Sequence, residues 1–224
     1  VLGKGIGASI DEDDGFAGVP YELFIFPGIL TMTVLFQSVF YGLYIVWDRK
    51  IDFLKEVLAA PLNRSTVFLG KCLGGVTDSM IQVTIIIVLG LFIFPEIDYT
   101  LQSLMLVYLY LFLLAVIMTS LGLIIGSQMD SPEGFSLITS LVVFPMYFLS
   151  GALFLKNNLI EEAPVIYWLT AINPASYAVD AIRYTMIPED IFLEFGLARD
   201  FTVLIGFCIF LLALGTQCFK TMRL

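Results

Sequence analysis

Few side chains in this sequence could carry out chemistry. The chain contains no histidine, which excludes Ser–His and Cys–His nucleophile pairs and every histidine metal site. The phosphate-binding pattern G-x-x-x-x-G-K-[ST] is missing as well, so the usual nucleotide cradle is excluded. Asp78 is the only acidic residue within a predicted membrane span, so a pair of intramembrane aspartates is not supported. We therefore predict no catalytic residue, no metal site and no cofactor.

Asp78 leaves two interpretations open. It follows Lys71 by seven residues, which is roughly 10 Å along a helix. At that depth the carboxylate could meet water or pair with Thr77 and Gln82, which would be a structural role. The other interpretation is a proton or substrate site, and an Asp78→Asn variant with normal transport would exclude it.

The densest group of charges lies between two apolar stretches, at residues 47–71 (WDRKIDFLKEVLAAPLNRSTVFLGK). This segment holds five of the eleven Lys and Arg residues, namely Arg49, Lys50, Lys55, Arg64 and Lys71. Basic residues concentrate in the cytoplasmic loops of membrane proteins. The segment is therefore predicted to be a cytoplasmic connection between two spans.

Residues 49–60 are predicted to form one short amphipathic helix. Apolar residues recur there at helical spacing between charged ones; they are Ile51, Leu54, Val57 and Leu58. Pro61 would end this helix, and Asn63 could cap a second helix that begins at Arg64. A surface helix of this kind can rest on lipid headgroups or fit a groove in a partner protein, and the residue pattern alone leaves both open.

The composition places the chain in a membrane. Hydrophobic residues make up 59% of it, charged residues make up 14%, and the mean hydropathy is +0.95. These values are typical of a polytopic membrane protein, and they exclude a soluble domain and a nucleic-acid partner. We predict an all-α protein with one transmembrane domain over residues 1–224. Its five spans are expected at residues 23–46, 72–94, 104–125, 136–155 and 201–219.

Two segments are predicted to lie on the outer side. Residues 1–22 form a glycine-rich acidic loop, whose run of acids lacks the ligand spacing of a calcium loop. Residues 156–198 are too polar to span but hold apolar groups throughout, so they are predicted to form two short re-entrant or surface helices. One covers about 165–171, and the other begins with Asn173 as its cap and Pro174 at its first position.

The distribution of charges agrees with this topology. Predicted cytoplasmic segments hold seven basic and five acidic residues, whereas the outer segments hold four basic and fourteen acidic residues. Lys220 and Arg223 follow the last span. The asymmetry predicts a C-terminus in the cytoplasm and a chain that crosses the cell membrane several times, with lipid around it.

Two prolines and two tyrosines are candidate moving parts. Pro27 predicts a kink or a late start in the first span, and Pro145 predicts a bend in the fourth. Tyr177 and Tyr184 share one face of the helix that Asn173 is expected to cap. That face could line an exit gate, or it could anchor the outer helices at the membrane interface.

Three motifs together resemble those of a known family. They are Ala60-Pro61-Leu62-Asn63-Arg64 with Gly70-Lys71, the stretch from Phe144-Pro145 to Ser150-Gly151-Ala152-Leu153-Phe154, and Asn173-Pro174 leading to Asp180-Ala181-Ile182-Arg183. In this order and spacing they resemble the ABC-2 type permeases, the drug-resistance, nodulation-factor and polysaccharide export branch of ATP-binding-cassette transporters. The resemblance covers essentially the whole chain.

The resemblance implies six spans per subunit, so a further helix is expected before Val1. It also implies a dimer of permeases, identical or not, bound to two separate ATPase subunits. The helix at 49–60 would then be the coupling helix, which favours partner contact over lipid contact. Its contact residues would be Arg49, Lys50, Phe53, Leu54, Lys55, Val57, Leu58, Pro61 and Arg64.

The predicted function is that of a permease subunit that exports an amphipathic drug, lipid or glycan-type substrate by alternating access. Its partners would hydrolyse the ATP, and the spans at 23–46 and 136–155 would tilt about Pro27 and Pro145. An ion- or proton-coupled secondary transporter is the alternative, although no inverted repeat is found. A structural or ion-conducting protein is a third option, and the sequence lacks a selectivity-filter signature.

Overall fold

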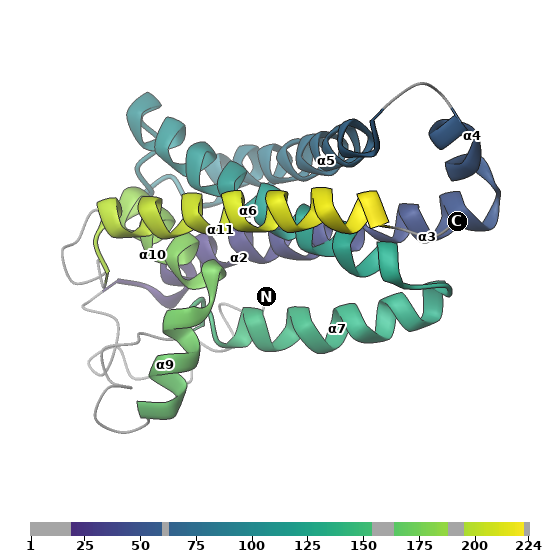
Figure 1. Ribbon diagram of the computed structural model, residues 1–224. Helices are drawn as coiled ribbons and strands as arrows, with labels where there is room; N and C mark the ends of the chain where they lie inside the picture. The colour runs from purple at the N-terminus through teal and green to yellow at the C-terminus, as the bar shows by residue number, and fades with distance from the viewer. Residues whose placement is uncertain (1–18, 60–62, 154–163, 188–194, 222–224) are drawn as a thin grey trace.

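The computed structural model describes residues 19–59, 63–153, 164–187 and 195–221. Within these ranges every regular element is a helix (Figure 1). In chain order they are α2 (Tyr21–Phe40), α3 (Leu43–Lys50), α4 (Phe53–Ala59), α5 (Arg64–Ile93), α6 (Leu101–Gln128), α7 (Pro132–Phe148), α9 (Pro164–Ile172), α10 (Pro174–Met186) and α11 (Leu197–Thr221). The predicted all-α class is confirmed.

Four stretches are long and apolar enough to cross a membrane, namely Tyr21–Lys50, Arg64–Ile93, Leu101–Gln128 and Leu197–Thr221. They correspond to four of the five predicted spans. The remaining one corresponds to α7, an apolar helix of 17 residues, which is at the lower limit of what can span a bilayer. Figure 1 shows α7 running alongside α2 and α3. The chain is therefore a polytopic helical membrane protein.

Helix α6 is the centre of the bundle, and α2, α5, α10 and α11 all pack against it. The helix approaches the junction of α2 and α3 very closely. A Cβ added to Gly122 on α6 would lie 2.1 Å from the carbonyl oxygen of Val39, and one added to Gly42 would lie 2.1 Å from the carbonyl oxygen of Gly122. Only hydrogen atoms on these two Cα positions allow the backbones to approach so closely.

The first span has a break that the sequence did not predict, at residues 41 and 42. Helix α2 does not start late: it begins at Tyr21 and runs through Pro27. The helix ends at Phe40, and the chain turns at Tyr41 and Gly42 before α3 begins. This turn lies where the chain crosses α6, so the tight crossing rather than the proline interrupts the span.

The two short helices predicted after the fourth span are present. Helix α9 covers the predicted 165–171, and α10 begins after Asn173, whose side-chain oxygen accepts a hydrogen bond from the Ala175 amide (3.1 Å). Helix α10 is buried along almost its whole length, whereas α9 exposes Val165 and Trp168. In Figure 1 both lie at the opposite end of the bundle from α4. We call these two ends the α10 end and the α4 end.

Candidate coupling site and gate

The predicted single helix at 49–60 is wrong, because the structure divides this segment into two helices. Helix α3 ends at Lys50 and α4 begins at Phe53. Between them Asp52 adopts a left-handed conformation (φ 59°), which stops the helix and which aspartate tolerates better than most residues. The amide of Asp52 donates to the Arg49 carbonyl (3.2 Å) as the chain turns. Arg49 and Lys50 therefore belong to the end of a span rather than to α4.

Helix α4 and the turn before it have one buried apolar side chain and two exposed ones. Leu54 is fully buried and fixes the helix to the bundle, while Phe53 and Ile51 are 47% and 68% exposed. Val57 is half-buried. Isolated exposed apolar residues are common, but two neighbouring ones at a sharp turn form a small contact surface. The structure does not describe the side chains of Lys55 and Leu58, and Pro61 lies outside its described residues.

Arg49 binds the turn between α6 and α7. Its guanidinium donates to the carbonyl oxygens of Ser127 (2.7 Å) and Met129 (3.3 Å) and to the carboxylate of Asp130 (3.1 Å). Carbonyl groups at the end of a helix lack partners within the helix and carry partial negative charge, so a cation there is favourable. Arg49 thus joins the end of α3 to the end of α6.

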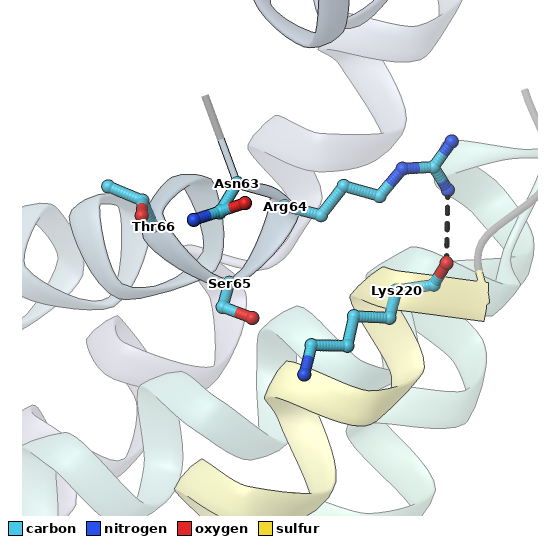
Figure 2. A pocket seen from close by; sticks show the side chains of 5 residues that line it. All are labelled: Asn63, Arg64, Ser65, Thr66 and Lys220. Atoms are coloured by element: carbon cyan, nitrogen blue, oxygen red, sulfur yellow. Dashed lines mark hydrogen bonds between the residues drawn. The ribbon is translucent and has the colours of Figure 1, made fainter. Parts of the chain in front are cut away.

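Arg64 makes a similar contact with α11. Its guanidinium donates to the carbonyl oxygen of Lys220 (3.3 Å), as the dashed line in Figure 2 shows. The two residues line an open polar pocket together with Asn63, Ser65 and Thr66. Asn63 is the N-cap of α5, as predicted, but its side chain makes no capping hydrogen bond. The pocket therefore lies between the start of α5 and the end of α11.

The other basic residues of the loop divide between a buried pair and an exposed position. Lys71 forms an ion pair with Asp48, and both side chains are largely shielded from solvent. Lys50 is exposed and lies over the Trp47 ring, 5.6 Å from its centroid. Of the basic residues whose side chains the structure describes in this loop, Lys50 is thus the one that is exposed.

At the α10 end, polar side chains of α10 cover the end of α7. The side-chain amide of Asn173 donates to the Met146 carbonyl (2.6 Å), and the Ser176 hydroxyl donates to the Leu149 carbonyl (3.3 Å). These carbonyls belong to the last turn of α7 and to its C-cap, where helical partners are lacking. The end of α7 is therefore bound to α10 rather than left open to lipid.

Arg183 completes this connection. It is 2% exposed, and its guanidinium donates to the carbonyls of Gly151 (2.9 Å) and Ala152 (3.1 Å), just beyond α7. The same group lies over the Phe24 ring of α2, 3.9 Å from its centroid, where a cation and an aromatic face attract each other. We call Asn173, Ser176 and Arg183 the α10 latch, because together they hold the end of α7 against α10 and α2.

The four predicted moving parts lie in different surroundings. Pro27 is buried inside α2, and Pro145 is exposed inside α7, near its end. Tyr177 is buried, stacks on Phe195 at 4.8 Å and donates to the Ala171 carbonyl, while Tyr184 is half-buried. Tyr177 thus packs inside the α10 end.

The connection between α5 and α6 is also attached to α10, through Asp98. Its amide donates to the Met186 carbonyl (3.0 Å). Its carboxylate accepts from the Ser103 hydroxyl and the Thr100 amide, which hold the pKa of Asp98 below its ordinary value. Hydrogen bonds to the charged form of a carboxylate have this effect.

This lowered pKa predicts acid sensitivity at the connection. A carboxylate with a lower pKa in the folded state stabilises the fold above its unfolded pKa of about 3.9 and loses that contribution as the pH falls through the folded pKa. We expect Asp98→Asn to lower the thermal unfolding midpoint at pH 6 and to differ less from the parent protein at pH 3. A difference that stays constant with pH would contradict this.

Comparison with known proteins decides the family. The sequence model of the ABC-2 type transporter family matches residues 4–187. The chain belongs to this family. It is 27% identical over 215 residues to the inner membrane transport permease YadH of Escherichia coli (strain K12), covering 93% of this chain and 77% of that protein. It is 26% identical over 201 residues to nodulation protein J of Neorhizobium galegae, covering 87% and 73% respectively.

Membership identifies the chain as a transmembrane component of an ABC transporter and implies association with ABC ATPase subunits. Within this permease, the structure brings Arg49, Arg64 and Leu54 to one end of the bundle, where they hold helices together. The sequence did not predict that Arg49 binds the α6–α7 turn or that Arg64 binds Lys220, because nothing in the local pattern indicates a contact so far along the chain. It also missed the role of Arg183, although this arginine ends one of the three family motifs and lies in a segment rich in apolar residues.

Proposed function

We propose that this permease subunit exports an amphipathic drug, lipid or glycan-type substrate by alternating access, driven by separate ATPase subunits. Two permease copies assemble around the path. Membership in a transporter family supports the general role. The aromatic residues of α2, which pair with those of α7 at Phe36–Phe144 (5.3 Å) and Phe40–Phe135 (6.4 Å), support an amphipathic substrate.

Helix α4 is the coupling helix in this proposal, and the α4 end faces the cytoplasm. The observation that carries this assignment is the sharp turn at Asp52, which directs α4 away from the axis of the span that precedes it (Figure 1). Leu54 holds α4 to the bundle, and Phe53 is left on its outer side. An exposed aromatic side chain on a short, firmly attached helix suits a groove in a partner protein.

Force on α4 would reach the spans through the contacts of Arg49. Movement of α4 shifts the end of α3, and Arg49 transmits this to the turn before α7. Helix α7 then tilts about Pro145, and α2 bends at Pro27. Because the α10 latch binds the far end of α7, α7 and α10 move together and change access at the α10 end.

Phe53→Ala tests the coupling site. Loss of a central aromatic residue in an interface typically costs 2 kcal/mol or more, or a roughly 30-fold fall in affinity. We expect the variant to retain far less of the Walker-motif ATPase when the tagged permease is purified from membranes, and to lose substrate-stimulated ATP hydrolysis. The permease itself should remain in the membrane at its usual level, because Phe53 is exposed.

Phe92→Ala is the matched control. Phe92 is also exposed, at 82%, but it lies near the end of α5 that is remote from α4. This variant should retain the ATPase. Equal retention by both variants would refute the assignment of α4, and transport driven by an ion gradient without any ATPase would favour a secondary transporter instead.

Orientation can be tested separately. A cysteine introduced at the exposed Lys50 position should react with a membrane-impermeant maleimide only after the cells are opened. Reaction in intact cells would place the α4 end outside, where no ATP-driven partner could reach it.

A further inference from the structure

A polar strip lies on the outer surface of α2 and α5, halfway along α5. Asp78 lies at the midpoint of α5 and is exposed, as is Gln82 one turn later, while Thr33 and Gln37 on α2 are half-buried. Exposed carboxylate and amide groups are costly against lipid tails. This strip is therefore unsuited to contact with the hydrocarbon of the bilayer.

Three of these four polar residues, Thr33, Gln37 and Gln82, line one groove. Gln37 extends toward Asp78, its amide nitrogen 3.5 Å from the carboxylate. The groove has both polar and apolar side chains in its lining, which consists of Met32, Thr33, Phe36, Gln37, Phe40 and Gln82. The rings of Phe36 and Phe40 are stacked nearly parallel, with an interplanar angle of 8°. None of the six lining residues is charged. Asp78 lies beside the lining, at the Gln37 amide, and supplies the charge at the edge of the groove.

We infer that this groove binds the positively charged, amine-bearing end of an amphipathic substrate. Asp78 supplies the opposite charge, and the amides of Gln37 and Gln82 offer further hydrogen-bond acceptors. The two phenylalanine rings provide apolar and cation–π contact for the body of the same molecule. An anionic substrate would meet the Asp78 carboxylate without any cation in the lining, so the groove selects against it.

The groove is also connected to the proposed moving parts. Phe36 contacts Phe144, the residue before Pro145 on α7. Occupation of the groove therefore acts directly on the helix that tilts in the proposed mechanism. The inference rests on the proposed export function for its meaning, but binding can be measured without the ATPase.

The experiment uses the purified permease in lipid nanodiscs, without ATP. Binding of the cationic dye rhodamine 6G is followed by fluorescence anisotropy, with dodecylamine and dodecanol as charged and uncharged competitors. The parent protein should bind the dye and release it to dodecylamine in preference to dodecanol. Asp78→Asn keeps the size of the side chain but removes its charge, and it should weaken dye binding about tenfold, the loss expected for one charge-assisted hydrogen bond. Glu133→Gln, an exposed acid on α7, is the control and should bind normally.

Two results would overturn the inference. One is equal dye affinity for Asp78→Asn and the parent protein. The other is efficient disulfide cross-linking of two copies through Gln82→Cys, which would mean that a second subunit covers the groove. If Phe53→Ala loses the ATPase as expected while Asp78→Asn binds the dye normally, the binding role of the groove is refuted and the coupling role of α4 stands. If no ATPase accompanies the permease but dye binding depends on Asp78, the proposed coupling fails and the binding site stands.

Discussion

Replacing Gly122 with alanine is expected to destabilise the permease by about 3 kcal/mol, at the upper end of what overpacking costs. The added methyl group would lie 2.1 Å from the Val39 carbonyl oxygen and 2.8 Å from its carbonyl carbon. These are backbone atoms, so no side chain can rotate away, and α2 and α6 must separate. Since α6 contacts most of the bundle, the separation would spread. We expect a lower thermal unfolding midpoint in detergent and less protein in the membrane.

Gly206→Ala provides the matched control for this substitution. Gly206 also lies inside a spanning helix, α11, but a Cβ there would meet no atom within 4 Å. Alanine has the better helix propensity by up to about 1 kcal/mol, so this variant should be as stable as the parent or slightly more so. If Gly122→Ala behaved like Gly206→Ala, the close crossing of α2 and α6 would be wrong.

Replacing Arg183 with alanine is expected to lower the free energy of unfolding by about 3 kcal/mol. Hydrogen bonds from a charged group contribute about 1.5–3 kcal/mol each. The substitution leaves the buried carbonyls of Gly151 and Ala152 without the guanidinium, and it removes the cation over Phe24. For a chain of this length, such a change lowers the unfolding midpoint by roughly 6–12 °C. Arg183→Lys should recover only part, since an ammonium cannot reproduce the planar fork.

Arg199→Ala tests whether the effect is specific to the latch. Arg199 is exposed and lies over the Phe195 ring at 5.1 Å, a contact that contributes about 0.5–1 kcal/mol at the surface. Its loss should therefore be minor.

Transport measured at a temperature where Arg183→Lys is still folded would show whether the latch also moves α7 with α10. Full transport by that variant would limit the latch to a structural role.

The helices themselves were largely predictable from the sequence. Long apolar runs predicted the spans, and the Asn173-Pro174 pair predicted the start of α10, because both signals act over one or two turns. The turn at Asp52 was not predicted, because the apolar spacing continues from α3 into α4. A single left-handed residue does not change that pattern. The interruption at Gly42 depends on a partner helix, and its sequence neighbours do not reveal it.

The position of the basic residues between two spans was predictable, but their contacts were not. The basic loop was located by charge alone, yet the sequence suggested that its arginines would face a partner. In the structure Arg49 and Arg64 instead bind the ends of α6 and α11. The burial of α10 was equally unexpected, since a segment containing Asp180 and Arg183 looks too polar for an interior. These features arise from tertiary packing, which overrides local composition.

The hydrogen bonds of Arg49 have a consequence for how the protein is made. Arg49 lies at the end of α3, but the carbonyls that it binds belong to Ser127 and Met129, near the end of α6. During synthesis α5 and α6 must therefore be made before this guanidinium can reach these carbonyls. Only when the ribosome has completed α6 can the early and late parts be fastened together, so a chain that stalls before that point would remain open to quality-control proteases.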